Sequence, residues 1–268
     1  MPEEQATKSA RAAAHRLGKW MRQVKDDQVA QAEALPLRRD MVTLLTYLHE
    51  NRVRGTRSTG NLPLKAVREV TARFVNPPQL DRTIGDRTFR LRSEDDVWPL
   101  YFLHTLAYVG GLLEGCPTRP WVLTPGGARF LAASPLAQVW ILFATWWERI
   151  NWLIAYSFRG MGESLPPRFE EITLVHLLSS PVGKWIPFEP FADKLIQETG
   201  LKWTAPDMTF ARMILHGAIK NMVIGILVSF GVVETEYRDK PLGRGTIKEL
   251  VAFQITSFGR GLLESLEA

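Results

Sequence analysis

The chain has 268 residues, a net charge of +5 and a sequence pI near 9.4, and 46% of its residues are hydrophobic against 23% charged. This length accommodates two domains of about 100 residues, each with its own core, and the composition excludes a long disordered tract. Cys116 is the only cysteine, which excludes an internal disulfide and a cysteine-built zinc site and favours a reducing cytoplasm.

The most apolar runs, residues 135–147 and 221–233, are bounded by charged residues before they reach the roughly 20 apolar residues of a membrane span. Residues 1–31 contain no uninterrupted apolar core of the kind that a secretory signal needs. We therefore expect neither a membrane segment nor a signal peptide.

Residues 8–24 are predicted to form an amphipathic helix, because basic and apolar positions recur with helical spacing. The basic face carries Lys8, Arg11, His15, Lys19 and Arg22, and the opposite face carries Ala14, Leu17, Met21 and Val24. We expect an arm that packs on its own or a neighbouring domain and leaves the basic face in solvent. The alternative is a basic face that lies along nucleic-acid phosphates. Acidic flanks argue against a surface that binds anionic lipid.

Two further helices are predicted over residues 37–51 and 63–74, with Pro63 suited to the first turn of the second. Between Arg52 and Arg92, ten basic residues accompany three acidic ones. This segment carries a net charge of +7, so the rest of the chain sums to −2 and the basicity is local. A concentrated basic surface is typical of proteins that bind a phosphate backbone, although solubility alone could also produce it.

Two segments are rich in aromatic residues. Residues 97–109, for which Ser93 and the acidic run after it predict an N-cap and first turn, are almost wholly apolar and suit a core or partner surface. Residues 135–158 are predicted to form one connecting helix that carries four tryptophans, Trp140, Trp146, Trp147 and Trp152. Burial in a spacer core is the favoured interpretation, because large aromatic side chains prefer buried positions. The alternatives are a dimer or partner interface and, less favoured, a platform for unpaired bases.

The second half is predicted to contain a strand over residues 184–188 and helices over residues 170–178, 190–199 and 206–230. On the long helix, Arg212, His216 and Lys220 are four residues apart and share one face, which suits either DNA contact or a solvated or dimer-facing surface. Eighteen residues then separate Glu234 from Phe253, enough for a long hairpin. Its basic tip could enter a minor groove or remain a solvated hairpin.

The sequence contains one unit twice. Residues 122–131 and 254–263 have Thr, Gly and Leu at matching positions, and each copy follows a glycine, Gly111 or Gly231, that ends a long apolar segment. The repeated order of apolar helix, glycine, β run, loop, β run, threonine and final helix predicts a winged helix-turn-helix. The predicted fold class is mainly α with small β wings. Its parts are a helical arm over residues 1–36, winged-helix domains over residues 37–134 and 169–268, and a connecting region over residues 135–168.

One part of the sequence resembles a known family. The run Arg57-Ser-Thr-Gly-Asn-Leu-Pro-Leu-Lys-Ala-Val-Arg68, followed by Ser93-Glu94, Gly111-Leu-Leu and Leu123-Thr-Pro-Gly-Gly127, is similar to a winged-helix region of uncharacterised bacterial proteins associated with plasmids and insertion elements. Domains attached to bacterial helicases have a similar pattern. The resemblance covers residues 37–147 and implies a DNA-linked context without catalytic residues. It does not extend to the C-terminal half.

In a winged helix the third helix usually reads bases in the major groove, with Arg, Lys, Asn or Gln on its exposed side. Residues 97–109 do not suit this role, so DNA contacts are expected mainly with phosphates and with little sequence reading. The residues expected to make these contacts in the first domain are Arg54, Arg57, Lys65, Arg68, Arg82, Arg87, Arg90 and Arg92. In the second domain they are Arg212, Lys220, Lys240 and Arg244.

The sequence contains no motif typical of catalysis: no glycine-rich phosphate loop ending in Lys-Ser/Thr, no nucleophile elbow and no His-Glu-x-x-His. Its five histidines are scattered, and those within apolar helices are expected to be hydrogen-bonded core residues. We expect a non-enzymatic protein without cofactor, metal or small-molecule substrate, cytoplasmic or nucleoid-associated, that binds DNA in transcription regulation or in a mobile genetic element. The alternative is a dimeric winged-helix adaptor that docks on chromosome-organising, transposition or transcription machinery without binding DNA itself.

Overall fold

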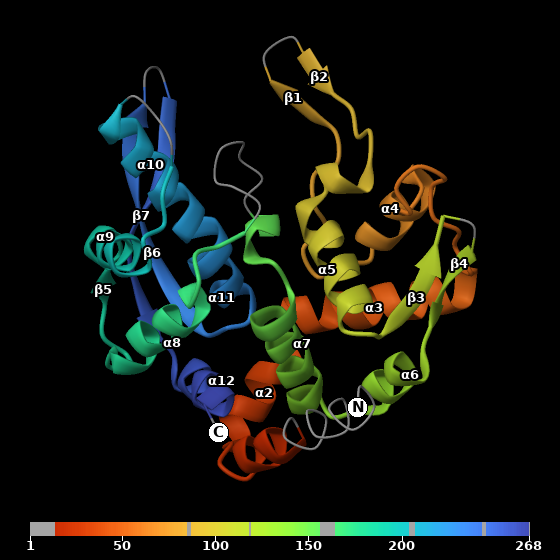
Figure 1. The fold of residues 1–268 in the computed structure, drawn as a ribbon. Coiled ribbons are helices and arrows are strands. Elements are labelled where there is room, and N and C mark those ends of the chain that lie inside the picture. The colour runs from red at the N-terminus through yellow and green to blue at the C-terminus, as the bar shows by residue number, and fades with distance from the viewer. Residues whose placement is uncertain are drawn as a thin grey trace. The chain divides into compact units, whose positions relative to one another are not determined.

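The computed structural model describes residues 14–84, 87–117, 119–155, 164–203, 207–242 and 245–267. Helices account for 60% of the structure and strands for 14%, and the strands form three small antiparallel sheets, which confirms a mainly α chain with small β elements (Figure 1). The chain divides into two compact units. The central unit comprises residues 29–150, and the C-terminal unit comprises residues 151–268 together with residues 1–28. The domain bounds drawn from the sequence repeat stay a prediction.

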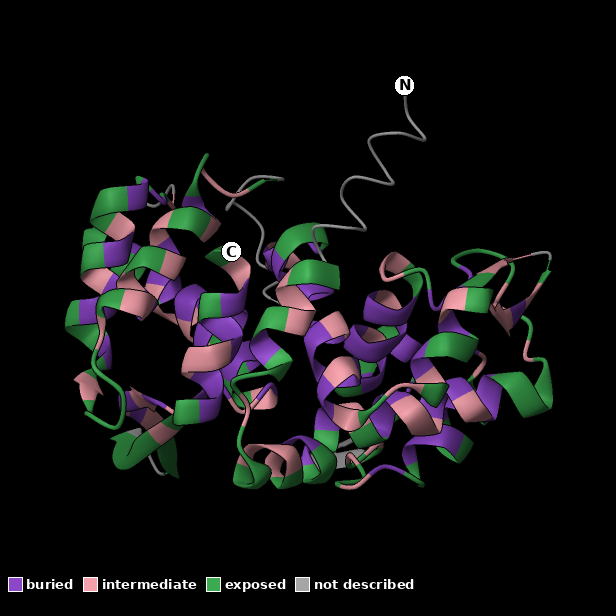
Figure 2. Cartoon of the chain, turned by 90° about the horizontal axis from the view of Figure 1, so that it is seen from below, coloured by how far each residue is buried: buried purple, intermediate pink, exposed green. Residues whose placement is uncertain are grey.

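Helices of the central unit pack around a core formed by α3, α5 and α7. Its elements are α2 (Asp26–Ala34), which crosses the unit boundary, α3 (Pro36–Asn51), α4 (Leu64–Thr71), β1 (Arg82–Ile84), β2 (Arg87–Phe89), η1 (Glu94–Asp96), α5 (Trp98–Val109), β3 (Leu113–Cys116), β4 (Arg119–Leu123), α6 (Pro125–Ala132) and α7 (Pro135–Arg149). Met41, Leu44 and Leu48 on α3 are fully buried, as their helical spacing predicts. Figure 2 shows that buried and exposed residues alternate along the helices. Between α4 and η1 the chain forms a short hairpin, in which Thr83 pairs with Thr88.

The acidic run after Ser93 does not form the first turn of α5. It forms the separate 3-10 turn η1, and α5 begins at Trp98. The carboxylate of Asp96 accepts the backbone N–H groups of Arg92 and Ser93 at 2.9 and 3.2 Å. Glu94, by contrast, is 0% exposed, so a residue expected on a helix surface is an interior carboxylate.

The connecting helix predicted over residues 135–158 is shorter in the structure. α7 ends at Arg149, because Ile150 adopts extended backbone angles. Trp152 then lies in a separate 3-10 turn, η2 (Trp152–Ala155), which belongs to the C-terminal unit.

All four tryptophans of this region are buried in the folded chain. Trp140, Trp146, Trp147 and Trp152 are 4%, 1%, 8% and 0% exposed. Side chains that are buried to this degree do not present a docking surface, so the structure supports the core interpretation and not the partner interface that these tryptophans could have formed.

The C-terminal unit follows the predicted order of helices and strands. Its elements are a helix over residues 14–21, η2, α8 (Phe169–Ser179), β5 (Ile186–Pro187), α9 (Phe188–Thr199), α10 (Met208–Ile219), η3 (Lys220–Gly225), α11 (Ile226–Ser229), β6 (Val233–Leu242), β7 (Gly245–Ile255) and α12 (Ser257–Glu267). The long helix expected over residues 206–230 contains a π-helical segment, η3, between α10 and α11. The long hairpin is confirmed, with strand order β5-β7-β6 in its sheet.

One continuous helical stretch, Met208–Ser229, is long and apolar enough to cross a membrane by length and composition, within the part of the chain that the structure describes. Of its most apolar window, 56% is buried inside the protein. The buried core helix of a soluble protein has the same length and composition, so this helix is weak evidence for a span.

The N-terminal helix packs on the C-terminal unit through a residue that its periodicity did not single out. Trp20 is 4% exposed, and its ring meets that of Phe258 on α12 edge to face at 5.9 Å between centroids. Met21, which was expected to face inward, is 38% exposed. His15 and Lys19 are exposed, whereas Lys8 and Arg11 lie outside the described residues.

The repeated sequence builds the same backbone frame in both units. Gly111 and Gly231 end their helices in the left-handed region, with φ of +69° and +68°. The Thr124 hydroxyl donates to the Gly111 carbonyl at 2.6 Å and accepts the N–H of Gly127 at 3.0 Å. In the second copy, the Thr256 hydroxyl makes the corresponding bonds to the residue-231 carbonyl and the residue-259 N–H, both at 2.8 Å. The internal repeat is therefore a structural repeat.

A close backbone contact explains why both copies have a glycine three residues after the threonine, at Gly127 and Gly259. A Cβ atom on Gly127 would lie 2.2 Å from the carbonyl oxygen of Leu112, and one on Gly259 would lie 2.1 Å from that of Val232. Only glycine lets the final helix approach the start of the hairpin so closely.

Candidate nucleic-acid interface

The basic residues predicted to contact DNA in the central unit divide into exposed and paired groups. Arg54, Arg57, Arg90 and Arg92 are exposed and make no ion pair with any residue that the structure describes. Exposed cations without a carboxylate partner keep their full charge for an external anion. The side chains of Arg82 and Arg87, on β1 and β2, lie outside the described residues.

Lys65 and Arg68 have acidic partners. The ammonium of Lys65 lies 3.8 Å from the Glu69 carboxylate, one helical turn away. Arg68 donates to the Asp81 carboxylate at 3.1 Å, and the same carboxylate accepts the N–H of Leu91 at 3.0 Å. These two hydrogen bonds, that of Arg68 foremost, lower the pKa of Asp81. Arg68 thus helps to fix the base of the β1–β2 hairpin and is a weaker candidate for DNA contact than the unpaired arginines.

A further exposed arginine, Arg119, was not singled out from the sequence. It begins β4, which also pairs with the segment after α3: Arg54 bridges Pro120, and the Val53 carbonyl accepts the N–H of Trp121 at 2.8 Å. The backbone pairing places Arg54 and Arg119 on neighbouring strands. We call Arg54, Arg57 and Arg119 the arginine edge.

A pocket of about 310 Å³ is lined by residues that are close in sequence to the arginine edge. It is enclosed by α5, by the loop that leads into α4 and by the β3–β4 hairpin. The lining residues are Thr59, Gly60, Asn61, Tyr101, His104, Thr105, Tyr108, Gly115, Cys116, Pro117 and Trp121. Pocket and arginine edge are contiguous in sequence, since Arg57 precedes Thr59 by two residues and Pro120 alone separates Arg119 from Trp121.

Aromatic rings form much of this pocket. Trp121 is 7% exposed and donates its indole N–H to the Gly60 carbonyl at 2.9 Å, which ties the hairpin to the loop before α4. Tyr108 packs against the Trp121 ring edge to face, with centroids 5.6 Å apart, and is itself 55% exposed. Tyr101, Thr105 and Tyr108 follow one another at helical spacing along α5, so hydroxyl-bearing side chains occupy the positions where a groove-reading helix would carry Arg, Lys, Asn or Gln.

A buried carboxylate and imidazole lie behind the pocket. Glu94 accepts the Leu62 N–H at 2.5 Å and lies 2.7 Å from Nδ1 of His104, so both of its oxygens have partners. His104 meets the Trp121 ring edge to face at 4.4 Å, and its Nε2 is buried without a hydrogen-bond partner. The expectation of hydrogen-bonded histidines in apolar helices is thus confirmed for one ring nitrogen of His104.

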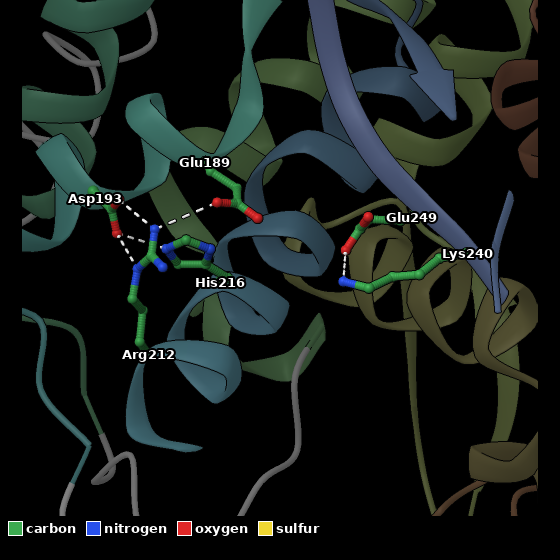
Figure 3. Close-up of polar contacts among 6 residues, drawn as sticks. All are labelled: Glu189, Asp193, Arg212, His216, Lys240 and Glu249. Atoms are coloured by element: carbon green, nitrogen blue, oxygen red, sulfur yellow. Dashed lines mark hydrogen bonds and ion pairs between the residues drawn. The ribbon is translucent and has the colours of Figure 1, made fainter. Parts of the chain in front are cut away.

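The basic stripe predicted on the long helix of the C-terminal unit is neutralised by the neighbouring helix α9 (Figure 3). Arg212 donates from Nε and Nη2 to the two carboxylate oxygens of Asp193 at 2.9 and 2.7 Å, and lies 3.4 Å from Glu189. His216 shares the same carboxylate at 2.8 Å. Hydrogen bonding by Arg212, with a further contribution from His216, lowers the pKa of Asp193 to about 2.

Charges on the long hairpin are also paired. Lys240 bonds to Glu249 across the two strands, and Lys248 lies 2.7 Å from Asp239. Lys220 lies over the ring of Tyr237 at 5.5 Å, and Arg244 is outside the described residues. Arg212, Lys220 and Lys240 do lie around one pocket, described below, but Arg212 and Lys240 are paired with carboxylates there and do not form a free basic surface.

Beside the exposed Thr209 and Arg212, α10 exposes three large apolar side chains. Met208, Phe210 and Met213 are 78%, 42% and 59% exposed, and Tyr237 and Ile247 on the hairpin are also exposed. A second pocket, of about 330 Å³, lies between α10 and this hairpin and includes both Met213 and Ile247.

No family model, curated protein or solved structure matches this chain. No group of three or more His, Cys, Asp or Glu residues within the described part of the chain could hold a metal ion.

Proposed function

We propose that each unit is a winged helix. The C-terminal unit has the order helix, strand, helix, helix, strand, strand, formed by α8, β5, α9, α10 with its extensions, β6 and β7, and its third strand lies between the other two. The central unit has the same order in α3, the bridged residue Arg54, α4, α5, β3 and β4, with the β1–β2 hairpin and η1 inserted between α4 and α5. The shared Gly, Thr and Gly hydrogen-bond frame supports the assignment of both units to one fold type.

We propose that the chain is a non-enzymatic DNA-binding protein whose contacts lie in the central unit and are made mainly with phosphates. The observation that carries this proposal is the arginine edge, three exposed arginines without a carboxylate partner among the described residues and close in sequence to the lining of an aromatic pocket. Arginine forms bidentate hydrogen bonds with phosphate, and such contacts bind without reading sequence. The side chains of Tyr101, Thr105 and Tyr108 on α5 support low sequence specificity.

Salt-dependent fluorescence anisotropy with a labelled DNA duplex tests this proposal. Each phosphate contact contributes about −0.9 to the slope of log K against log salt, so replacing Arg54, Arg57 and Arg119 by alanine should make the slope shallower by about 2.7. The matched control removes three paired cations with the same change in net charge, by the substitutions Arg168→Ala, Arg212→Ala and Lys240→Ala. An equal loss in both triple variants would show that net charge, and not the arginine edge, determines binding.

The exposed apolar surface of α10 supports a second candidate function, a dimeric adaptor that docks on a protein partner. Contiguous exposed apolar side chains mark protein interfaces. Equilibrium sedimentation of wild type beside a Met208→Lys, Met213→Lys variant tests this function: a dimer that the double substitution dissociates supports it. A wild-type chain that stays monomeric throughout the concentration series rules out the self-associating adaptor.

A further inference from the structure

The pocket in the central unit combines three features that duplex phosphate contacts do not use. It is concave, it is lined by aromatic rings, and it has a buried polar atom behind those rings. A volume of about 310 Å³ is at the lower end of the range for ligand pockets. It suits one planar ring system, and a paired base inside a duplex cannot enter it.

His104 gives the pocket its polar specificity. Its Nδ1 bonds to Glu94, a fully buried carboxylate whose other oxygen is held by the Leu62 N–H, so the ring orientation is fixed from behind. Nε2 is then the ring nitrogen of His104 that is buried without a hydrogen-bond partner among the described residues. A neutral imidazole with Nδ1–H accepts at Nε2, and an imidazolium donates there. Both forms match the edge of a nucleobase, which carries N–H donors beside carbonyl and ring-nitrogen acceptors.

The aromatic side chains supply the stacking surface. Tyr108 is 55% exposed at the mouth of the pocket and packs against Trp121, which itself meets His104. Bases stack on such rings with little dependence on sequence, because every base has a π face. Arg57 and Arg119 adjoin the pocket in the chain and can hold the phosphates on either side of an inserted base.

We infer that this pocket takes one unpaired nucleobase of a single-stranded nucleic acid. The base enters beside Tyr108, stacks on its ring and directs its polar edge toward Nε2 of His104, while the arginine edge contacts the flanking phosphates. The inference rests on the proposed function for the phosphate contacts, and the aromatic pocket adds a preference for single strands over duplex.

The experiment uses the full chain and a single-stranded oligothymidine that carries one internal 2-aminopurine. Stacking should quench 2-aminopurine fluorescence, and anisotropy of the same strand and of a matched duplex gives both affinities. Tyr108→Ala should remove the quenching and weaken single-strand binding about 10-fold, with duplex affinity unchanged. Tyr108→Phe keeps the ring and should behave as wild type. Tyr237→Ala, which removes an exposed tyrosine from the other hairpin, should change nothing.

Two results overturn the inference. One is a Tyr108→Ala variant with wild-type quenching, and the other is an equal loss of single-strand and duplex binding, which would mark Tyr108 as a general contact. If wild type binds no strand in any arm, the proposed function fails, and 2-aminopurine riboside alone then tests the pocket. If the wild-type chain quenches the free nucleoside and Tyr108→Ala does not, the pocket is supported independently of the proposed function. If the wild-type chain does not quench it, the inference is overturned as well.

Discussion

The two units use one backbone frame to present different surfaces. In each, a helix ends at a left-handed glycine, a hairpin follows, and a threonine hydroxyl joins that glycine to the start of the last helix. In the central unit, the adjoining surface has unpaired arginines and an aromatic pocket. In the C-terminal unit, Arg212, Lys240 and Lys248 each have a carboxylate partner, and α10 exposes three large apolar side chains, Met208, Phe210 and Met213.

This difference shows that charge counted along the sequence is a poor measure of charge available to a ligand. Arg212 and His216 form a basic stripe when α10 is considered alone, but α9 supplies the carboxylate of Asp193 to both. Arg54 and Arg57 have no such partner among the described residues. The two copies therefore retain the frame for folding and differ in the side chains that they expose.

The largest effect should come from adding a methyl group at the close contact within the frame. Gly127→Ala and Gly259→Ala each place Cβ about 2 Å from a carbonyl oxygen of the backbone, and neither neighbour can rotate away. Each variant should lose about 3 kcal/mol of unfolding free energy, measured by urea denaturation followed by circular dichroism. Gly18→Ala is the control, because its Cβ meets only the end of the Arg22 side chain at 3.7 Å in a helix, and it should be neutral or stabilising. A tolerated Gly259→Ala beside a damaging Gly127→Ala would show that the two frames are not equivalent.

Removing the threonine hydroxyl of either frame should cost less unfolding free energy than the glycine substitutions do, and the loss should be equal in the two units. Thr124→Val and Thr256→Val keep the side-chain shape but remove a donor to the glycine carbonyl and an acceptor for the helix N–H. Each should cost about 1–2 kcal/mol, the range for a lost helix cap, in the same urea assay. Thr→Ser at either position keeps the hydroxyl and should recover most of the loss. A clear difference between the two valine variants in lost unfolding free energy would show that the threonine hydroxyl stabilises only one of the two copies.

The frame could be predicted from the sequence because its determinants are local. Thr and Gly three residues apart, after a glycine that ends an apolar run, are enough to indicate the turn, the hairpin and the last helix in both copies. The hydrophobic spacing of α3 likewise predicts the residues that it buries. The pocket of the central unit and the ion pairs have no such local pattern in the sequence. Asp193 lies 19 residues before Arg212, and Glu94 lies ten residues before His104, with an intervening change of helix type.

Local periodicity also fails where a single large side chain determines the packing. In the N-terminal helix, the spacing of small apolar residues predicts that the face with Met21 is buried. The face with Trp20 is buried instead and packs against Phe258, because Trp20 buries more apolar area. The tryptophans of α7 show the same preference for burial. The burial of the α7 tryptophans was predicted on this ground, and the same weight on residue size would have placed Trp20 inward.

The smallest expected effect concerns the carboxylate that neutralises the stripe of the C-terminal unit. The folded-state pKa of Asp193 is lowered from 3.8 to about 2, so its pairing with Arg212 and His216 stabilises the fold fully above pH 3.8 and is lost as pH falls through 2. Because these groups are substantially exposed, solvent screening limits the contribution to less than about 1 kcal/mol. Wild type should therefore exceed Asp193→Asn in stability by the same small amount from pH 7 to pH 5, and the two should converge between pH 4 and pH 2. Asp207→Asn, which keeps an N-cap oxygen on α10 but removes a carboxylate that has no arginine partner among the described residues, controls for the loss of a carboxylate. If the gap between wild type and Asp193→Asn stays constant down to pH 2, the pairing in Figure 3 does not exist in solution, and Arg212 would then be as available to phosphate as the arginines of the central unit.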